Sequence, residues 1–215
     1  MKKGLFITFE GGEGVGKSTQ IRLLHDYIQQ KYGNKEIILT REPGGSAGAE
    51  EIRSLLLNGK TNRWDKLSEL LLFSAARRNH LTEKIWPAME KKAIVLCDRF
   101  FDSTVAYQCY GYGFNEEMYH QAQTLYQMIA GYFEPDLTFI LDLDVEIGLQ
   151  RSRTRAGNNE QRFEDMQLSF HQNLRKGFLE IAYKNPKRCI VIDASQTIDD
   201  IHKQIVQSFE EHIAL

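Results

Sequence analysis

The sequence predicts an α/β fold: a doubly wound parallel sheet of about five strands, flanked by helices on both faces. Short apolar runs alternate with longer amphipathic segments along the chain. The apolar runs are continuous, which is typical of strands buried on both faces of a parallel sheet. Polar or glycine-rich motifs follow directly after several of these runs, at the sheet edge where ligands bind in such folds. Together these observations favour an α/β architecture with its ligand site beyond the carboxyl ends of the strands.

Each candidate strand contains a core of three consecutive apolar residues. Each is short enough for a strand and is bounded by polar residues or glycine. They are the segments 5–10, 36–41, 93–98, 137–142 and 188–193. The alternation of these strands with helical segments predicts parallel pairing.

The segments between the candidate strands carry apolar residues at helical spacing. Segment 17–31 places its apolar residues on one face, and so does segment 66–90. Pro87 lies inside the second segment, and we expect a kink or a break there. The last helix is expected to begin after Thr197, which has the spacing of a capping box with Asp200.

Size and charge limit the classes of function. The chain has 215 residues, 42% of them hydrophobic and 26% charged, and its formal net charge is -2. This composition is typical of a folded protein, and we expect a single domain over residues 1–215. Nucleic-acid-binding proteins usually carry a basic excess, so DNA or RNA is not expected as the partner. A small anionic ligand needs only a local cluster of cations.

The cysteines and the apolar runs indicate the cellular compartment in which the protein is expected. Cys97, Cys109 and Cys189 are the three cysteines, and they form no CxxC pair. This argues against a disulfide framework or a zinc site and favours the reducing cytoplasm. The apolar run near the start is too short for a signal peptide, and no stretch approaches the ~20 apolar residues of a membrane span. We therefore expect a cytoplasmic protein without a membrane partner.

A phosphate-binding loop follows the first candidate strand. The pattern GxxxxGK[ST] is matched in full by Gly11, Gly12, Glu13, Gly14, Val15, Gly16, Lys17 and Ser18. Glycines let backbone N–H groups turn inward around phosphate oxygens, and the helix that follows adds its positive end. We expect Lys17 to reach the β- and γ-phosphates of ATP and Ser18 to offer its hydroxyl to Mg²⁺. A chance glycine-rich turn would lack this strand–loop–helix context.

A second polar motif closes the third candidate strand. Asp98 lies at the strand end, where a carboxylate near a P-loop can hold Mg²⁺ through water or accept a proton. The alternative is a structural aspartate that caps the next helix. Hydroxyl, phenol and amide side chains then cluster in segment 102–108, as a site that binds a polar ring requires.

At this point the chain resembles the bacterial thymidylate kinases, a family of P-loop nucleoside monophosphate kinases. The matching segments appear in the family's order and cover most of the chain. The Arg-Glu-Pro-Gly-Gly and Asp-Arg…Ser-Thr-x-Ala-Tyr-Gln segments are specific to this family, whereas the P-loop is shared with many others. The matching segments are 9–19, 40–45, 73–78, 98–108 and 135–138.

The resemblance implies a site for the thymine base and the sugar. Phe73 would stack on the thymine ring, Arg77 would bond its O4 edge, and Thr104 and Gln108 would complete the base contacts. Tyr107 would lie against the sugar C2′ and disfavour ribose. Taken from the sequence alone, Phe73 could instead be a core residue on the helix stripe, and a tyrosine such as Tyr107 is more often a packing residue.

The resemblance also implies how the phosphates are held. Arg53 and Arg99 would bind the acceptor phosphate, which suits the fork of a guanidinium group. Glu13 would approach the acceptor sugar and the phosphate region, and Glu42 would lie at the magnesium-water edge of the acceptor site. Thr19 would complete the phosphate loop. Lys17, Asp98 and Arg99 are thus catalytic candidates, with Ser18 and Asp98 as the metal-binding residues.

Four arginines indicate a lid over residues of about 151–163. Arg151, Arg153, Arg155 and Arg162 surround a Gly-Asn stretch that favours a turn. Phosphoryl transfer requires cations on the transferring group while water is excluded, and a closing lid supplies both. Gly14 carries no arginine, and the bacterial type places its arginine in the lid. We expect Arg153 or Arg155 on the transferring group and Arg151 near the adenine.

These observations predict a kinase that uses ATP and Mg²⁺ to phosphorylate dTMP to dTDP. The resemblance also implies a homodimer formed through helix packing. A kinase for another nucleotide, such as dUMP, CMP or a deoxynucleoside, remains an alternative. A P-loop GTPase switch is a second alternative, but the sequence contains neither Asn-Lys-x-Asp nor Asp-x-x-Gly. A purely structural role would leave the P-loop unexplained.

Overall fold

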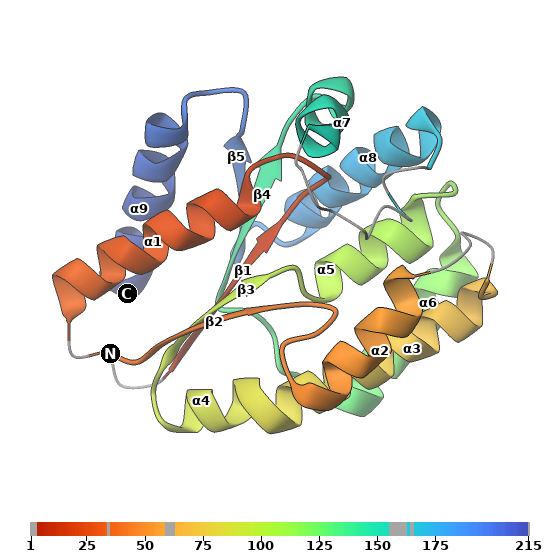
Figure 1. Cartoon of the computed structure of the whole chain (residues 1–215), viewed down its shortest axis with the longest axis horizontal. Coiled ribbons are helices and arrows are strands. Elements are labelled where there is room, and N and C mark those ends of the chain that lie inside the picture. The colour runs from red at the N-terminus through yellow and green to blue at the C-terminus, as the bar shows by residue number, and fades with distance from the viewer. Residues whose placement is uncertain (1–3, 34, 59–62, 155–162, 164–165, 215) are drawn as a thin grey trace.

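The computed structural model describes residues 4–33, 35–58, 63–154, 163 and 166–214. A five-stranded parallel sheet lies at its centre in the order β2-β3-β1-β4-β5 (Figure 1). The strands are β1 Leu5–Glu10, β2 Ile37–Arg41, β3 Ile94–Asp98, β4 Leu137–Asp142 and β5 Cys189–Asp193. The predicted parallel α/β sheet is therefore confirmed, with three strands beginning one residue later than expected.

The helices follow the strands in the alternation that the sequence predicts. They are α1 Lys17–Tyr32, α2 Ala47–Leu57, α3 Lys66–His80, α4 Trp86–Glu90, α5 Phe101–Thr104, α6 Glu116–Ala130, α7 Val145–Arg153, α8 Leu168–Lys184 and α9 Ile198–Ala214, with the π-helical segments η1 Leu81–Ile85 and η2 Val105–Tyr110. No helix in the described part of the chain is both long enough and apolar enough to cross a lipid bilayer.

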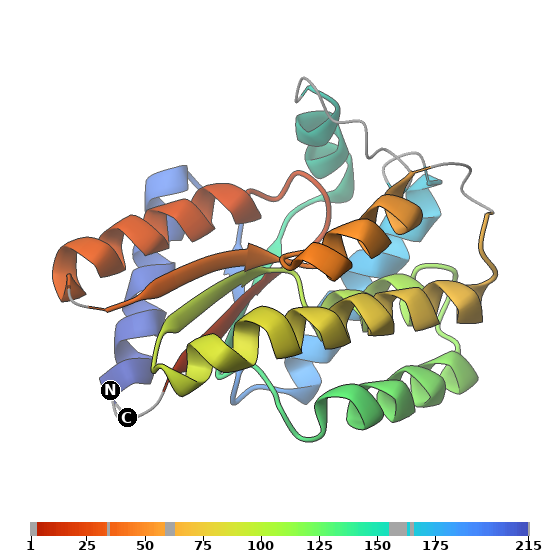
Figure 2. The ribbon, with the colours of Figure 1, turned by 60° about the horizontal axis from the view of Figure 1, so that its bottom comes forward.

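The sheet separates two apolar cores. Leu5, Ile7 and Phe9 of β1 belong to the core under α1 and α9. Phe6, between them in the sequence, belongs to the core under α3, α4, α6 and α8, because alternate side chains of a strand point to opposite faces. Figure 2 shows the helices on both sides of the sheet.

The register of the strands brings their polar carboxyl ends to the same edge of the sheet. Phe9 of β1 pairs with Asp98 of β3, and Arg41 of β2 pairs with the same residue. Asp142 of β4 pairs with Asp193 of β5 at the corresponding position. Since all five strands are parallel, the loops that follow them converge at this edge, which positions the site.

The expected break at Pro87 takes a different form. The chain passes from α3 through η1 into α4, and Trp86 donates its backbone N–H to the carbonyl of Leu81, five residues back. In a regular α-helix the proline ring would collide with the carbonyl four residues earlier. The wider π turn directly before Pro87 accommodates the ring, so the chain stays helical.

The predicted start of the last helix is confirmed. The Asp200 backbone N–H donates to Thr197 Oγ1 over 3.2 Å, and the Thr197 hydroxyl donates to the Asp200 carboxylate over 2.8 Å. The helix begins at Ile198. Asp65 caps α3 in a similar way, because its carboxylate accepts from the backbone N–H groups of Leu67 and Ser68.

Candidate functional site

The loop between β1 and α1 has the backbone of a phosphate cradle. Gly14 and Gly16 have φ angles of 66° and 97°, which side chains rarely tolerate. Lys17 Nζ lies 2.7 Å from the Gly12 carbonyl oxygen and 3.2 Å from that of Gly11. Burial, together with the nearby Arg99 guanidinium, lowers the pKa of the Lys17 ammonium to about 8. The Lys17 side chain is thus held against the loop in which it is expected to bind phosphate.

The loop packs against the backbone of α7. A Cβ atom at Gly14 would collide with the carbonyl oxygen of Gly148, and one at Gly148 would meet the carbonyl oxygen of Glu13. The close approach of two backbones therefore leaves no room for a side chain at Gly14. This explains physically why the loop carries no arginine there.

Oxygen ligands for a hard cation lie beside Lys17. The Ser18 hydroxyl donates to Asp98 Oδ2 over 3.1 Å, and Asp98 Oδ1 is buried with no hydrogen-bond partner among the described residues. Within those same residues no group of three or more His, Cys, Asp or Glu side chains could hold a metal. One hydroxyl and one carboxylate with a spare oxygen fit Mg²⁺, which keeps several waters and relies on phosphate oxygens for the rest.

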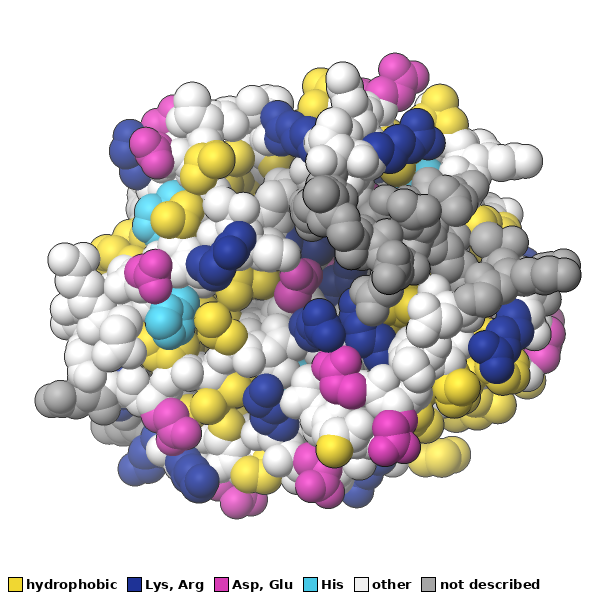
Figure 3. Space-filling view, in the orientation of Figure 1, with side chains coloured by type: hydrophobic (Ala, Val, Ile, Leu, Met, Phe, Trp, Pro, Cys, Tyr) yellow, Lys and Arg dark blue, Asp and Glu magenta, His cyan; other side chains and the backbone are white. Residues whose placement is uncertain are grey.

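A cavity of about 290 Å³ opens next to the loop. Figure 3 shows Lys and Arg side chains gathered around the hollow in the middle of this face. Most of the predicted site residues line this cavity: Glu13, Gly14, Val15, Gly16, Lys17, Ser18, Glu42, Arg53, Phe73, Arg77, Asp98, Arg99, Thr104, Tyr107 and Gln108. Gly11 and Gly12 line a smaller cavity behind the loop, and Thr19 lines the groove beside β2.

Arg99, Glu13 and Tyr107 form a polar cluster at the boundary between the loop and this cavity. Arg99 Nη1 donates to the Gly11 carbonyl over 2.8 Å, and Nη2 donates to Glu13 Oε1 over 2.9 Å. Its guanidinium carbon lies 5.1 Å from the centre of the Tyr107 ring. Burial opposes ionisation of Glu13, but Arg99, Lys17 and the Tyr107 hydroxyl outweigh it and lower the pKa of Glu13 to about 2. Glu13 therefore stays a carboxylate.

Arg77 is held from behind by a buried carboxylate. Its Nε donates to Glu42 Oε2 over 2.7 Å, and its Nη2 donates to Thr104 Oγ1 over 2.8 Å. The second oxygen of Glu42 lies 3.0 Å from His80 Nδ1, and Thr40 Oγ1 lies 2.6 Å from His80 Nε2. Both oxygens of Glu42 are thus engaged. Arg77 Nη1 has no hydrogen-bond partner among the residues that the structure describes.

Gln108 lines the same cavity as Arg77 and is held by a second carboxylate. Gln108 Nε2 donates to Glu69 Oε1 over 3.0 Å, and both side chains are buried. Gln108 Oε1 is buried without a hydrogen-bond partner in the described part of the chain. Arg77 and Gln108 both line the cavity, and each keeps one hydrogen-bonding group without a partner among the described residues, Nη1 of Arg77 and the buried Oε1 of Gln108.

Phe73 and Arg53 complete the wall of the cavity. Phe73 of α3 is half-buried, lines the cavity, and belongs to neither apolar core. An aromatic ring in this position suits a stacking platform better than core packing. Arg53 of α2 donates from Nη1 to the Pro43 carbonyl over 2.6 Å, which brings its guanidinium to the cavity wall.

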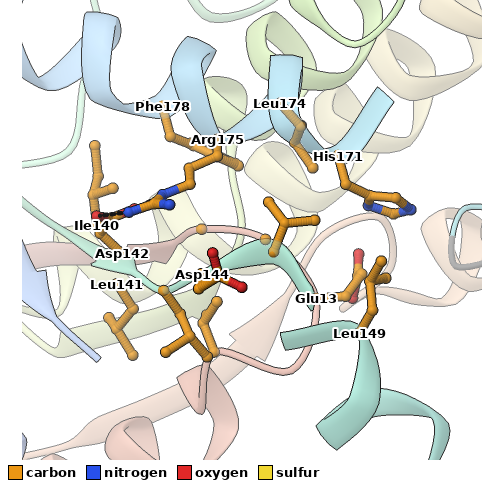
Figure 4. Close-up of a pocket in the computed structure, with 15 residues that line it drawn as sticks. Glu13, Ile140, Leu141, Asp142, Asp144, Leu149, His171, Leu174, Arg175 and Phe178 are labelled. Carbon is orange, nitrogen blue, oxygen red and sulfur yellow. Dashed lines mark hydrogen bonds and ion pairs between the residues drawn. The ribbon is translucent and has the colours of Figure 1, made fainter. Parts of the chain in front are cut away.

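A small cavity of about 20 Å³ lies between the phosphate loop, the end of β4 and α8 (Figure 4). Arg175 of α8 forms two hydrogen bonds with the Asp142 carboxylate, at 2.7 and 2.9 Å. His171, one turn earlier on α8, faces the loop, where its charge would add to those that lower the pKa of Glu13. Helix α8 thus supports the loop from behind.

The predicted lid begins inside a helix. Arg151 and Arg153 occupy the last turn of α7, and both are exposed. Arg151 Nη1 lies 3.5 Å from the Ala194 carbonyl oxygen, in the loop after β5. Arg155 and Arg162 fall outside the described residues. Phe163, where the predicted lid ends, packs edge-on against Tyr107 with ring centres 5.2 Å apart.

The sequence reasoning missed the buried polar residues beneath the cavity. Glu10 accepts hydrogen bonds from the Phe100 backbone N–H over 2.7 Å and from the Ser103 hydroxyl over 2.5 Å. Burial and the nearby Asp102 carboxylate raise the pKa of Glu10 to about 7. Ser103 also accepts from Arg99 Nη1. The available signal was a glutamate at the end of an otherwise apolar strand.

Comparison with known proteins points to one family. A family profile described as thymidylate kinase matches residues 9–205. A thymidylate kinase of Caulobacter vibrioides is 47% identical over 215 residues, covering 100% of both chains. One of Magnetococcus marinus is 48% identical over 97% of this chain and 96% of its own. The crystal structure of thymidylate kinase from Ehrlichia chaffeensis matches with a TM-score of 0.77 and 37% identity, covering 96% of this chain and 98% of that one.

Proposed function

The chain belongs to the thymidylate kinase family, and we propose that it phosphorylates dTMP to dTDP with ATP and Mg²⁺. The observation that carries this proposal is the pair of unengaged groups on the cavity wall, next to a phosphate loop. Thymine presents a carbonyl acceptor at O4 and an N–H donor at N3. Arg77 Nη1 supplies donors for the first, and Gln108 Oε1 supplies an acceptor for the second. Cytosine presents the opposite pattern.

The rest of the acceptor site follows from this placement. Phe73 stacks on the base, and Thr104 supports Arg77 beside the base. Arg53 and Arg99 bind the acceptor phosphate, and Glu13 and Tyr107 lie against the sugar. For Glu42 the geometry supports a role different from the magnesium-water edge, because both of its oxygens are engaged by Arg77 and His80. We assign Glu42 as the residue that positions Arg77.

The donor side is built for transfer by positioning and charge. An oxygen of the acceptor phosphate forms the new bond to the γ-phosphorus, and the bond to the oxygen bridging the β- and γ-phosphates breaks, so that ADP leaves. Loop N–H groups and Lys17 stabilise the charge that collects on these oxygens. Arg153 or Arg155 joins them from the lid. Arg151, near the Ala194 carbonyl, approaches the adenine.

Mg²⁺ fits the donor set beside the loop. Ser18 would bind it directly and Asp98 through water, and the spare Asp98 oxygen supports this assignment. When bound, the ion supplies positive charge to the β- and γ-phosphate oxygens. Lys17 and Arg99 already provide fixed cations around the same position, so these side chains orient the phosphates independently.

The proposal also covers the domain organisation, the oligomeric state and the cellular compartment of the protein. Both cores are built on one sheet, which supports a single domain. Leu67 and Leu71 of α3 are 42% and 48% exposed and line an open groove against α6. An apolar helix face of this kind supports a homodimer through helix packing. The three buried free cysteines support the cytoplasm as the compartment.

Product analysis tests the function directly. Purified protein incubated with MgATP and dTMP should form equimolar ADP and dTDP, separable by anion-exchange chromatography. The Lys17→Ala variant serves as the control for a contaminating kinase. Formation of ADP without dTDP, or equal dTDP formation by the variant, would contradict the proposal.

A further inference from the structure

The orientation of the Gln108 amide decides which base edge the cavity accepts. An amide presents a donor at one end and an acceptor at the other, and the two ends are nearly the same size. If the group rotated by half a turn, its N–H donors would take the place of Oε1, the buried acceptor that has no partner among the described residues. Something must therefore fix this orientation if thymine and cytosine are to be distinguished.

We infer that Glu69 is the positioning residue that sets base specificity, an inference that rests on the proposed function. Glu69 Oε1 lies 3.0 Å from Gln108 Nε2, and Glu69, unlike Gln108, does not line the cavity. A carboxylate has only acceptors, so it pairs with the amide NH₂ and repels the amide oxygen. This leaves Oε1 as the end that faces the substrate.

Burial makes this selection strong. Glu69 is 7% exposed and Gln108 is 6% exposed, so water does not offer the rotated amide an alternative partner. Rotation would bring two oxygens together and leave the NH₂ group without Glu69. An unmade hydrogen bond or an oxygen–oxygen contact is costly in such surroundings. Cytosine, whose N3 is an acceptor, consequently meets Oε1 and is rejected.

The position of Glu69 on its helix fits this role. Glu69, Phe73 and Arg77 follow one another at intervals of four residues on α3, so they share one helix face. This face supplies the stacking platform, the donor to O4 and the support for the N3 acceptor. Glu69 itself is absent from the cavity lining, and it acts through Gln108.

The Glu69→Gln variant tests the inference, with kcat/KM measured for dTMP and dCMP. The new side chain is isosteric and can donate or accept, so the Gln108 amide is free to rotate. We expect the dTMP-to-dCMP ratio to fall about tenfold to a hundredfold, since one buried hydrogen-bond mismatch is removed. The fall should come mainly from faster dCMP turnover. Arg77 still rejects the cytosine amino group, so discrimination is reduced and not abolished.

Matched variants separate this role from a structural one. Glu83→Gln makes the same change at an exposed position in η1 and should leave the ratio unchanged. Should Glu69→Gln not fold, Glu69→Asn supplies the same amide chemistry and Glu69→Asp keeps the carboxylate at the shorter length. The amide variant should relax discrimination, and the carboxylate variant should retain it.

A double variant tests the route of the effect. In a Gln108→Leu background, Glu69→Gln should no longer change the dTMP-to-dCMP ratio, because no amide remains to be oriented. An unchanged ratio in Glu69→Gln alone, or a parallel fall for both substrates, would overturn the inference. These outcomes are distinct from failure of the proposed function, which would appear as absent dTMP turnover in the unmodified protein.

Discussion

The Tyr107 hydroxyl donates a 2.5 Å hydrogen bond to Glu13 Oε1, which joins the wall of the acceptor cavity to the phosphate loop. The same oxygen accepts from Arg99 Nη2. The Tyr107 ring is thus fixed by its tip, by the guanidinium beside it and by Phe163 at its edge. A ring held on three sides is suited to exclude a sugar substituent by volume.

Tyr107→Ala should relax sugar selectivity. The ring is expected to occupy the volume that a 2′-hydroxyl requires. Its removal should therefore raise kcat/KM for ribothymidine monophosphate relative to kcat/KM for dTMP. Tyr107→Phe keeps the ring and loses only the bond to Glu13, so it should retain the selectivity. Steady-state rates for both acceptors give the ratio. If both rates fall together in Tyr107→Ala, the residue only packs the cavity.

Lys17→Ala should abolish most phosphoryl transfer while the fold remains intact. Removal of one preorganised donor from a transition state costs about 10²–10³-fold in rate. Among the described residues the side chain bonds only to loop carbonyls, so circular dichroism and thermal unfolding should show a folded protein. Turnover near that of the unmodified protein would contradict the role assigned to the loop.

Arg77→Ala should impair use of dTMP much more than use of ATP. The guanidinium is 3% exposed and held by Glu42 and Thr104, so its loss removes the donor to O4 and leaves Glu42 buried without its partner. Loss of one member of such a charged pair costs about 2–5 kcal/mol. Arg78→Ala is the control, because Arg78 is exposed and bonds the Ile129 carbonyl. Equal effects in both variants would contradict the assignment.

Glu10→Gln should flatten the dependence of folding stability on pH. Burial and the nearby Asp102 carboxylate raise the pKa of Glu10 to about 7 in the folded protein, from an ordinary value of 4.5. The contribution of Glu10 to the free energy of unfolding is complete below pH 4.5 and is lost as the pH rises through 7. The reason is that the folded state keeps the proton up to a higher pH than the unfolded state does. By linkage this loss is about 3 kcal/mol.

Urea unfolding at pH 5 and pH 7 measures this difference. Two neighbouring groups titrate mainly outside this range, since the pKa of Glu13 is about 2 and that of Lys17 about 8. The unmodified protein should lose more stability between the two pH values than Glu10→Gln does. Equal losses in the two proteins would show that Glu10 does not govern the dependence.

The strands and the phosphate loop were predictable because their signals are local. Each strand holds its own apolar run, and the loop is one continuous motif. The helices α2, α6 and α8 were not assigned beforehand. The segment after β3 was recognised by its polar residues, although its helical form, with the π turns of η2, was not. A π turn depends on packing that a sequence pattern does not encode.

The supporting residues of the site were harder to predict than the lining residues. Glu69 and His80 bond to residues far away in the sequence, Gln108 and Thr40 respectively. Only the folded chain brings these pairs together. A buried glutamate four residues before Phe73 was nevertheless a usable signal, because a polar residue on the same helix face as the ring has to find a partner.

The measurement that tests the account most directly is kcat/KM for dTMP, dUMP, dCMP and AMP, each with saturating MgATP in an ADP-release assay. In the proposed site, the donor on Arg77 and the acceptor on Gln108 would match thymine and oppose cytosine, and the Tyr107 ring is expected to exclude ribose. We therefore expect dTMP to be the best acceptor, with dCMP and AMP far below it. A higher kcat/KM for dCMP or AMP than for dTMP would contradict the account.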